Sequence, residues 1–282
     1  MQERYEVISM KDHYKIRLGI FEPKIPVKGV VQLIHGFGEH MGPYLPLIHF
    51  LVDSGFICIM HDQRGFGTLA AENPKKRGRA KHYEQFLSDI LEIRTIIGKK
   101  YANYPVYLFG HSMGGNIALN LLLRETENQS LYQKVILESP WLTLTHPPHV
   151  LLQKTAKIIG KISPDIRIHS GFDFDSVAQK PELARTVVND GIHHDFLSLR
   201  LFSELSEAGL FALNTSPNLK IPCLLFCGEK DKVCSPDAMR TFAQNAGKNL
   251  NFGEIKEGYH ALRLGKSSQE FFEKTRDFLL TD

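Results

Sequence analysis

The sequence predicts an α/β protein with a mostly parallel central sheet that is covered by helices on both faces. Three observations lead to this fold class: short apolar runs, amphipathic segments that alternate with them, and a break in this alternation in the second half of the chain. Nearly continuous apolar runs of this length are typical of strands buried on both faces of a parallel sheet. Five runs have this character, at residues 29–36, 56–62, 106–110, 134–139 and 223–228.

The chain begins with two alternating segments, residues 5–10 and 14–21, on either side of Lys11, Asp12 and His13. Alternation interrupted by a short polar turn predicts an antiparallel hairpin. We therefore expect an N-terminal hairpin ahead of the parallel strands.

Amphipathic segments with helical periodicity fill the intervals between the apolar runs. In one of them Phe86, Ile90, Ile93 and Ile97 recur at the spacing of one helix face. Strands that alternate with helices predict βαβ units in a doubly wound sheet. The expected helices cover residues 45–55, 82–101, 116–125, 236–247 and 267–280.

The alternation breaks between residues 141 and 217, where no segment has the pattern of a strong strand. Amphipathic segments take the place of strands, at residues 149–162, 181–190 and 195–213. Because the chain then returns to a buried strand and helix, we expect a helical lid inserted into one core domain. The core is then residues 1–140 and 218–282, and the lid is residues 141–217.

Composition narrows the classes of function. With 34 basic and 31 acidic residues the net charge is +3, so we expect no nucleic acid as partner. The N-terminal residues lack an apolar signal segment, and no stretch approaches the roughly 20 apolar residues that span a bilayer. We therefore expect a cytoplasmic protein.

Four cysteines are too few for a disulfide framework, and their spacing does not suit a zinc site. They are Cys58, Cys223, Cys227 and Cys234. We expect reduced thiols and neither a metal nor an organic cofactor.

Residues 110–114 read GHSMG and follow the apolar run VYLFG, at the point where a helix is expected. The pattern G-x-S-x-G between a strand and a helix places a nucleophilic serine on a sharp, strained turn. Gly110 and Gly114 leave room for that turn. The N-terminus of the following helix directs free N–H groups toward the site. Ser112 is therefore the candidate nucleophile.

A serine hydroxyl needs a general base, which in turn is oriented by an acid. Both partners follow later strands: Asp231 comes after the run at 223–228, and His260 follows the last strand-like segment. Loops at the carboxyl ends of strands hold the active sites of such sheets. Asp231 is the favoured acid, and the nearby Glu229 is the alternative.

Three other charged features have structural interpretations. Asp62 in HDQRGFG is expected to hold its turn together with Arg64, and Glu138 is expected to be a buried, hydrogen-bonded carboxylate. The basic run from Lys75 to Lys81 is interpreted as a solvated loop, with contact to anionic lipid as the alternative.

The charge that develops on a substrate carbonyl needs N–H donors that are already in place. The residue after the nucleophile, Met113, supplies one donor. The loop HGFGEH, after the run at 29–36, supplies the other, which we assign to Phe37. In both residues the donor is the backbone N–H.

Five motifs in order carry a family resemblance: HGFGEH, HDQRGFG, GHSMGG, GEKDKV and a late YH. They resemble the monoacylglycerol lipase and lysophospholipase branch of the α/β-hydrolase superfamily, which includes serine aminopeptidase-type sequences. The resemblance implies the α/β-hydrolase fold, the triad Ser112, Asp231 and His260, and Phe37 and Met113 as oxyanion donors. It also implies a lid over a largely apolar acyl pocket.

The resemblance adds candidates for substrate binding. Cys234 matches a cysteine near the site in monoacylglycerol lipases, and a small buried apolar role is its alternative. Tyr44 follows Met41-Gly42-Pro43, where relatives often carry an arginine before the tyrosine, so the head-group contacts there are expected to differ. Trp141 begins the insertion and is expected at the pocket mouth.

These observations favour a serine hydrolase that cleaves a small-molecule acyl ester of monoacylglycerol or lysophospholipid type. A peptidase of the proline-iminopeptidase type is the first alternative, and a non-catalytic binding protein on the same fold is the second. The peptidase needs acidic groups in the lid to bind an α-ammonium group. Asp173, Asp175, Asp190 and Asp195 are available for that role.

The lid segment 149–162 has one broad apolar face, and Lys154, Lys157 and Lys161 lie on another face. We expect the apolar face to pack over the pocket with the lysines in water. Peripheral contact of this helix with a membrane surface is the alternative.

Overall fold

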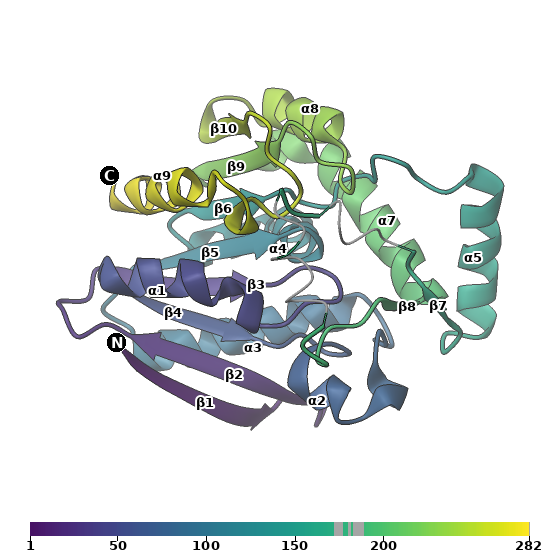
Figure 1. Ribbon diagram of the computed structural model, residues 1–282, viewed down its shortest axis with the longest axis horizontal. Helices are drawn as coiled ribbons and strands as arrows, with labels where there is room; N and C mark the ends of the chain where they lie inside the picture. Colours follow the sequence, from purple (N-terminus) through teal and green to yellow (C-terminus); the bar gives the residue numbers. More distant parts are fainter. Residues whose placement is uncertain (172–176, 180–181, 183–188, 282) are drawn as a thin grey trace.

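The computed structural model describes residues 1–171, 177–179, 182 and 189–281 of the chain. Within these residues one large sheet has eight strands, and Figure 1 shows helices packed on both of its sides. In sheet order the strands are β1 (Gln2–Ser9), β2 (Lys15–Glu22), β4 (Phe56–His61), β3 (Gly29–Ile34), β5 (Val106–His111), β6 (Val135–Glu138), β9 (Cys223–Gly228) and β10 (Leu250–Ile255).

The sheet is mixed in the way that the sequence predicts. β1 and β2 form the N-terminal antiparallel hairpin, and β2 also pairs antiparallel with β4. The other neighbours, from β4 to β10, pair in parallel. Each expected apolar run is a strand, and β3 to β6 and β9 are buried throughout.

Helices cover both faces of the sheet because successive side chains of a strand point to opposite sides. The helices are α1 (Leu45–Asp53), α2 (Gly67–Ala71), α3 (Glu84–Lys100), α4 (Met113–Arg124), α5 (Val150–Ile162), α7 (Leu199–Asn214), α8 (Pro236–Ala246) and α9 (Ser268–Leu280). In β3, Val30 and Ile34 join the apolar cluster under α3, α4, α7 and α8, whereas Val31 and Leu33 join the cluster under α1 and α9.

The chain between β6 and β9 holds α5, α7 and a two-stranded antiparallel sheet, β7 (Arg167–His169) with β8 (Phe196–Ser198). This small sheet corrects the expectation that the region has no strand, since three residues are too few for a visible alternation. Most of the expected helix at 181–190 lies outside the described residues. In Figure 1, α5 stands at the far edge of the molecule, and α7 connects it to the core.

Two buried asparagines of α4 fix α7 to the core. The Asn116 side-chain amide donates to the carbonyl oxygens of Trp141 and Leu205, at 2.7 and 3.1 Å. The Asn120 amide donates to the carbonyl of Ala208 at 3.0 Å. These bonds hold α7 directly over the helix that follows Ser112.

Helix α5 meets the expectation only in part: its lysines face water and Leu152 and Ala156 line a cavity, but most of its apolar side chains are exposed too. Its buried residues are Ala156 and Gly160, whereas Leu151, Ile158 and Ile162 are 68%, 61% and 77% exposed. Gly160 allows this packing, because a Cβ there would lie 2.7 Å from the backbone nitrogen of Arg200. The apolar face is therefore mostly turned outward.

On the α7 side of the helix, Lys157 forms an ion pair with Glu207 at 2.5 Å. Among the residues that the structure describes, no helix is long and apolar enough to cross a membrane.

Replacing Asn116 by leucine should destabilise the fold by roughly 3 kcal/mol. The change would remove the amide donor of two buried carbonyl groups, and the Tyr83 hydroxyl would lose its 2.7 Å bond to the Asn116 side chain. Urea unfolding measures this, with the exposed Asn103→Leu as a control that should shift stability by less than about 0.5 kcal/mol. Equal stability of both variants would contradict the proposed anchoring.

Candidate active site

Ser112 lies on a strained turn between β5 and α4. Its φ and ψ angles are 52° and −116°, in a region that side-chain-bearing residues rarely adopt. Backbone bonds hold it there: its N–H donates to the Glu138 carbonyl, and its own carbonyl accepts from Trp141, each at 3.0 Å. A Cβ on Gly114 would lie 2.3 Å from the Ile34 carbonyl oxygen, so only glycine lets α4 begin so close to β3.

Asp231 and His260 meet through a buried hydrogen bond. His260 Nδ1 donates to Asp231 Oδ2 at 2.8 Å. The other carboxylate oxygen accepts the backbone N–H groups of Val233 and Cys234, at 2.8 and 2.9 Å. The carboxylate is thus fixed by its own loop and in turn fixes the ring and tautomer of His260.

This pair lies next to the Ser112 turn. The His260 ring is 4.9 Å, centroid to centroid, from that of His111, the residue before Ser112. The Cys234 side chain contacts the Ser112 hydroxyl, so the loop after Asp231 also reaches the turn. Burial and the nearby Asp231 charge raise the pKa of the Cys234 thiol well above its usual range, which keeps this sulfur protonated.

The loop after β3 approaches the first residues of α4. Phe37 lies in this loop, with its ring packed edge-on to Phe66 at 5.6 Å. Met113 is the first residue of α4, and the first N–H groups of a helix have no acceptor within that helix. The close contact of Gly114 with Ile34 and His35 brings the two segments together.

A buried ion cluster connects this loop to the loop of His260. Arg263 donates to Glu138 Oε2 at 3.0 Å and also binds the Glu39 carboxylate. All three residues have less than a tenth of their surface exposed. Burial alone would raise the pKa of Glu39, but the Arg263 charge and contacts with His111 and Tyr44 hold it well below its usual range.

Tyr44, which the resemblance suggested as a substrate-binding residue, lies within this cluster. It is fully buried, and its hydroxyl donates to Glu39 and accepts from Gly36 N–H at 2.9 Å. His111 Nδ1 lies 2.9 Å from the same hydroxyl. Burial and the Arg263 charge lower the pKa of His111, which favours a neutral ring.

The other carboxylates occupy structural positions. Glu138 is the buried, hydrogen-bonded carboxylate that the sequence predicts. Asp62 accepts the backbone N–H groups of Met41 and Thr68, each at 3.0 Å, so it holds its turn as expected. Arg64 pairs with Asp89 and Asp12 instead. Glu229 is exposed and accepts the N–H of Glu257 at 3.1 Å.

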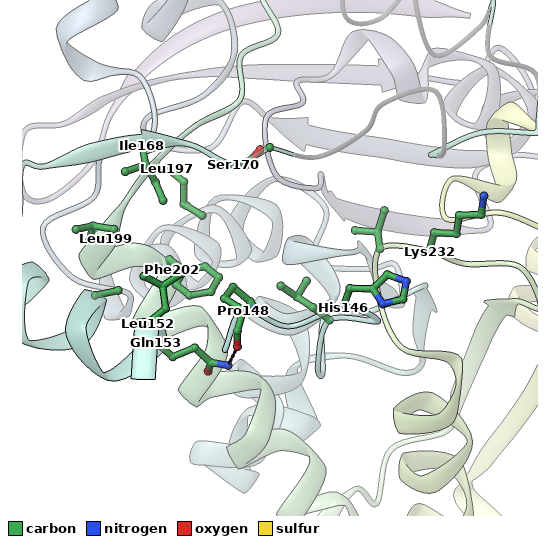
Figure 2. Close-up of a pocket in the computed structure, with 14 residues that line it drawn as sticks. His146, Pro148, Leu152, Gln153, Ile168, Ser170, Leu197, Leu199, Phe202 and Lys232 are labelled. Atoms are coloured by element: carbon green, nitrogen blue, oxygen red, sulfur yellow. Dashed lines mark hydrogen bonds between the residues drawn. The ribbon is translucent and has the colours of Figure 1, made fainter. Parts of the chain in front are cut away.

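A cavity of about 530 Å³ lies beside the loop that follows Asp231. Figure 2 shows its lining side chains, which come from the segment 144–148, α5, β7 and the two residues after it, β8, α7 and the loop after Asp231. Val233, two residues from Asp231, forms one part of the wall. Most of the lining is apolar: Leu144, Pro148, Leu152, Ala156, Ile168, Leu197, Leu199, Phe202 and Val233.

Trp141 is not part of this lining. Its side chain is almost fully buried and lies behind Phe202, with ring centroids 6.3 Å apart. Its expected place at a pocket mouth therefore stays a prediction.

The sequence did not reveal Arg263, or the role of Glu39 and His111 beside it. Arg263 and Glu39 are 224 positions apart, so no local spacing connects them. A usable signal was the charged side chain three residues after His260, in a segment that is otherwise apolar.

The family model described as serine aminopeptidase, S33, matches residues 25–265. The chain belongs to this family. It is 31% identical over 261 residues to a Schizosaccharomyces pombe protein that carries the name monoglyceride lipase provisionally, with 88% of this chain and 66% of that protein covered. Phospholipase YtpA of Bacillus subtilis is 27% identical over 252 residues, covering 88% of this chain and 94% of that protein.

The fold is also similar to that of solved structures. The monoacylglycerol lipase of Paleococcus ferrophilus matches with a TM-score of 0.84 at 26% identity, covering 94% of this chain and 98% of that chain. The chain has the α/β-hydrolase fold. It spans just under two thirds of the Schizosaccharomyces pombe relative's length.

The buried ion cluster of this S33 chain predicts a loss of stability in acid. A carboxyl whose pKa is lower in the folded state stabilises the fold above its unfolded pKa, about 4.3 for glutamate, and this contribution is lost as the pH falls through the folded pKa. Glu39→Gln should therefore be less stable at pH 7, by about 3 kcal/mol, because it leaves Arg263 incompletely paired. It should also lose less stability on acidification.

Urea unfolding between pH 7 and pH 3 measures both effects. The exposed Glu125→Gln serves as the control and should follow the parent chain at every pH. If Glu39→Gln and the parent chain lost stability in parallel below pH 5, the low folded pKa of Glu39 would be wrong.

Proposed function

We propose that this chain is a serine hydrolase that cleaves carboxylic esters carrying an acyl chain, with lipid esters of monoacylglycerol or lysophospholipid type as substrates. The observation that carries the proposal is the buried Asp231–His260 pair beside the strained turn of Ser112. A serine, an imidazole and a carboxylate in this relation form the constellation of acyl transfer. The relatives described above are named for the hydrolysis of lipid esters.

In the proposed mechanism, Ser112 Oγ attacks the ester carbonyl and His260 Nε2 accepts its proton. His260 Nδ1 is already engaged by Asp231, so Nε2 is the nitrogen left for this transfer. His260 then returns the proton to the leaving alcohol, and Ser112 is left as an acyl ester. A water molecule, activated by the same imidazole, hydrolyses this ester and restores the hydroxyl.

The tetrahedral intermediates carry a negative charge on the former carbonyl oxygen. We assign its two donors to the backbone N–H groups of Met113 and Phe37. The helix N-terminus at Met113 favours negative charge there. Glu39, two residues after Phe37, ties the second loop to Arg263, so the donor belongs to a loop with restricted motion.

The acyl chain is assigned to the cavity beside Val233. Its volume, about 530 Å³, lies within the usual range of ligand pockets, roughly 300–1,000 Å³. Its mostly apolar walls suit a hydrocarbon chain, which gains roughly 0.8 kcal/mol for each buried CH₂ group. Cys234, fully buried next to Ser112, adds apolar surface at the reactive end.

We assign residues 141–217 to the lid and propose that α5 rests on a membrane surface. Five exposed apolar side chains support this contact: Val150, Leu151, Leu152, Ile158 and Ile162. A patch of this kind on a helix suits the boundary between lipid head groups and acyl chains. Failure of the chain to bind phosphatidylcholine vesicles would refute the contact.

The peptidase alternative finds less support. Asp190 accepts a hydrogen bond from His40 Nε2 at 2.5 Å, and Asp195 accepts one from His169 Nδ1 at 2.8 Å, so both already have partners. Asp173 and Asp175 lie outside the described residues. The non-catalytic alternative does not explain the backbone strain at Ser112 or the buried Asp231–His260 pair.

Substitutions should separate the proposed acid from its neighbour. Ser112→Ala should lower kcat on p-nitrophenyl butyrate by roughly 10⁴-fold or more, with the fold intact. Asp231→Asn should lower it on the order of 10⁴-fold, because the amide no longer selects the required tautomer of His260. Glu229→Gln, at an exposed position two residues away, is the matched control and should retain nearly full activity.

Circular dichroism confirms folding in each case. A fully active Ser112→Ala would refute the mechanism, and an inactive Glu229→Gln beside an active Asp231→Asn would reassign the acid.

A substrate panel tests the chemical class. Esters of monoacylglycerol, lysophospholipid and p-nitrophenol should all be cleaved faster than prolyl or alanyl amides, because the cavity offers apolar surface. Initial rates at matched concentrations give the ratio kcat/KM for each pair. Faster cleavage of the amides would favour the peptidase.

A further inference from the structure

A second cavity, of about 740 Å³, lies apart from the residues of the proposed active site. Five parts of the chain line it: the hairpin turn at residues 12–14, Arg64, the basic segment with Gln85 at residues 75–85, Pro164 with Asp165, and Arg200. The helix α2 and the β7–β8 pair, which adjoin these segments in the chain, lie on the same side of the molecule in Figure 1.

This basic cavity has a large excess of positive charge. Its lining carries six cationic side chains and two carboxylates. The cations are Arg64, Lys75, Lys76, Arg79, Lys81 and Arg200, and the carboxylates are Asp12 and Asp165. From Asn73 to Tyr83 the chain contains no carboxylate at all. Since the whole chain has a net charge of only +3, its positive charge is concentrated here.

The two carboxylates are already occupied by arginines. Asp12 binds Arg64 at 2.8 Å, and Asp165 binds Arg79. Among the described residues, the ammonium groups of Lys75, Lys76 and Lys81 form no ion pair with a carboxylate. Three lysine charges are therefore available to a ligand.

The segment that carries these lysines is held in place by hydrogen bonds. Arg79 donates to the Lys75 carbonyl at 3.1 Å, and Arg200 donates to the Lys81 carbonyl at 3.0 Å. Arg167 of β7 donates to the carbonyls of Pro74 and Arg77, at 2.9 and 2.8 Å. A binding loop that is ordered in advance loses less entropy when a ligand arrives.

We propose that the basic cavity binds a phosphate-bearing anion, and that the head group of an anionic lipid supplies it. Lysine ammonium groups bind phosphate as point charges. The wall residues Pro164 and Asp165 lie between Ile162 and Ile166, which are 77% and 43% exposed. Apolar side chains next to a cationic cavity match the layering of acyl chains and phosphates at a bilayer surface.

The test compares two triple variants of the full chain. Lys75→Ala/Lys76→Ala/Lys81→Ala removes the lysines of the cavity, and Lys248→Ala/Lys256→Ala/Lys266→Ala removes the same charge from exposed positions beyond α8. Sedimentation with vesicles of phosphatidylcholine, with and without phosphatidic acid, measures lipid binding. Thermal unfolding with inorganic pyrophosphate measures binding of a soluble phosphate.

Each lysine near an anionic membrane contributes roughly fivefold to binding. The cavity variant should therefore lose roughly tenfold to a hundredfold in partition onto phosphatidic acid vesicles, whereas the control variant should lose little. Binding to phosphatidylcholine alone should be the same in all three proteins. A stabilisation by pyrophosphate that the cavity variant lacks, without any preference for phosphatidic acid, would keep the phosphate site and overturn its lipid source.

The proposal is overturned if the cavity variant binds both probes as the parent chain does, or if the control variant loses as much. Both triple variants should hydrolyse p-nitrophenyl butyrate normally, and Ser112→Ala should bind both probes normally. The outcome is thus independent of the proposed hydrolase activity.

Discussion

The buried ion cluster of Glu39, Arg263 and Glu138 is the constraint on which the geometry of the site depends. It connects the loop after β3, the end of β6 and the loop that carries His260. Burying these charges is costly, and only their mutual pairing makes it tolerable. Removing one member would leave an unpaired charge in the interior. The three segments are therefore held in a single arrangement, and each of them carries or adjoins a proposed catalytic group.

The strain at Ser112 depends on the same arrangement. A positive φ angle at a residue with a side chain costs roughly 1–3 kcal/mol and persists only where the surroundings enforce it. Here Glu138 takes part twice, through its carbonyl, which accepts the Ser112 N–H, and through its carboxylate, which binds Arg263. The element that holds the proposed nucleophile is thus the one that positions the loop of the proposed base.

The sheet and the placement of the three proposed catalytic side chains could be predicted because both follow from local patterns. Buried runs mark the strands, and Ser112, Asp231 and His260 each follow one, so a parallel sheet gathers them at one edge. Three features could not be predicted. Glu39 and Arg263 are too far apart in the chain to suggest a pair, and β7 and β8 are too short to show alternation. An amphipathic stripe on α5 does not say which side packs, and here the small residues Ala156 and Gly160 decided it.

The wall of the apolar cavity at Val233 and the wall at Leu152 are held in place by different contacts. Val233 belongs to the loop that Asp231 fixes through two backbone hydrogen bonds, so this wall is tied to the proposed catalytic acid. Leu152 belongs to α5, a helix with only two buried residues. A substitution on α5 can therefore reshape the far wall without disturbing Asp231 or His260. If the acyl chain binds in this cavity as proposed, the choice of ester depends on the α5 end, whereas the reaction depends on the end beside Asp231.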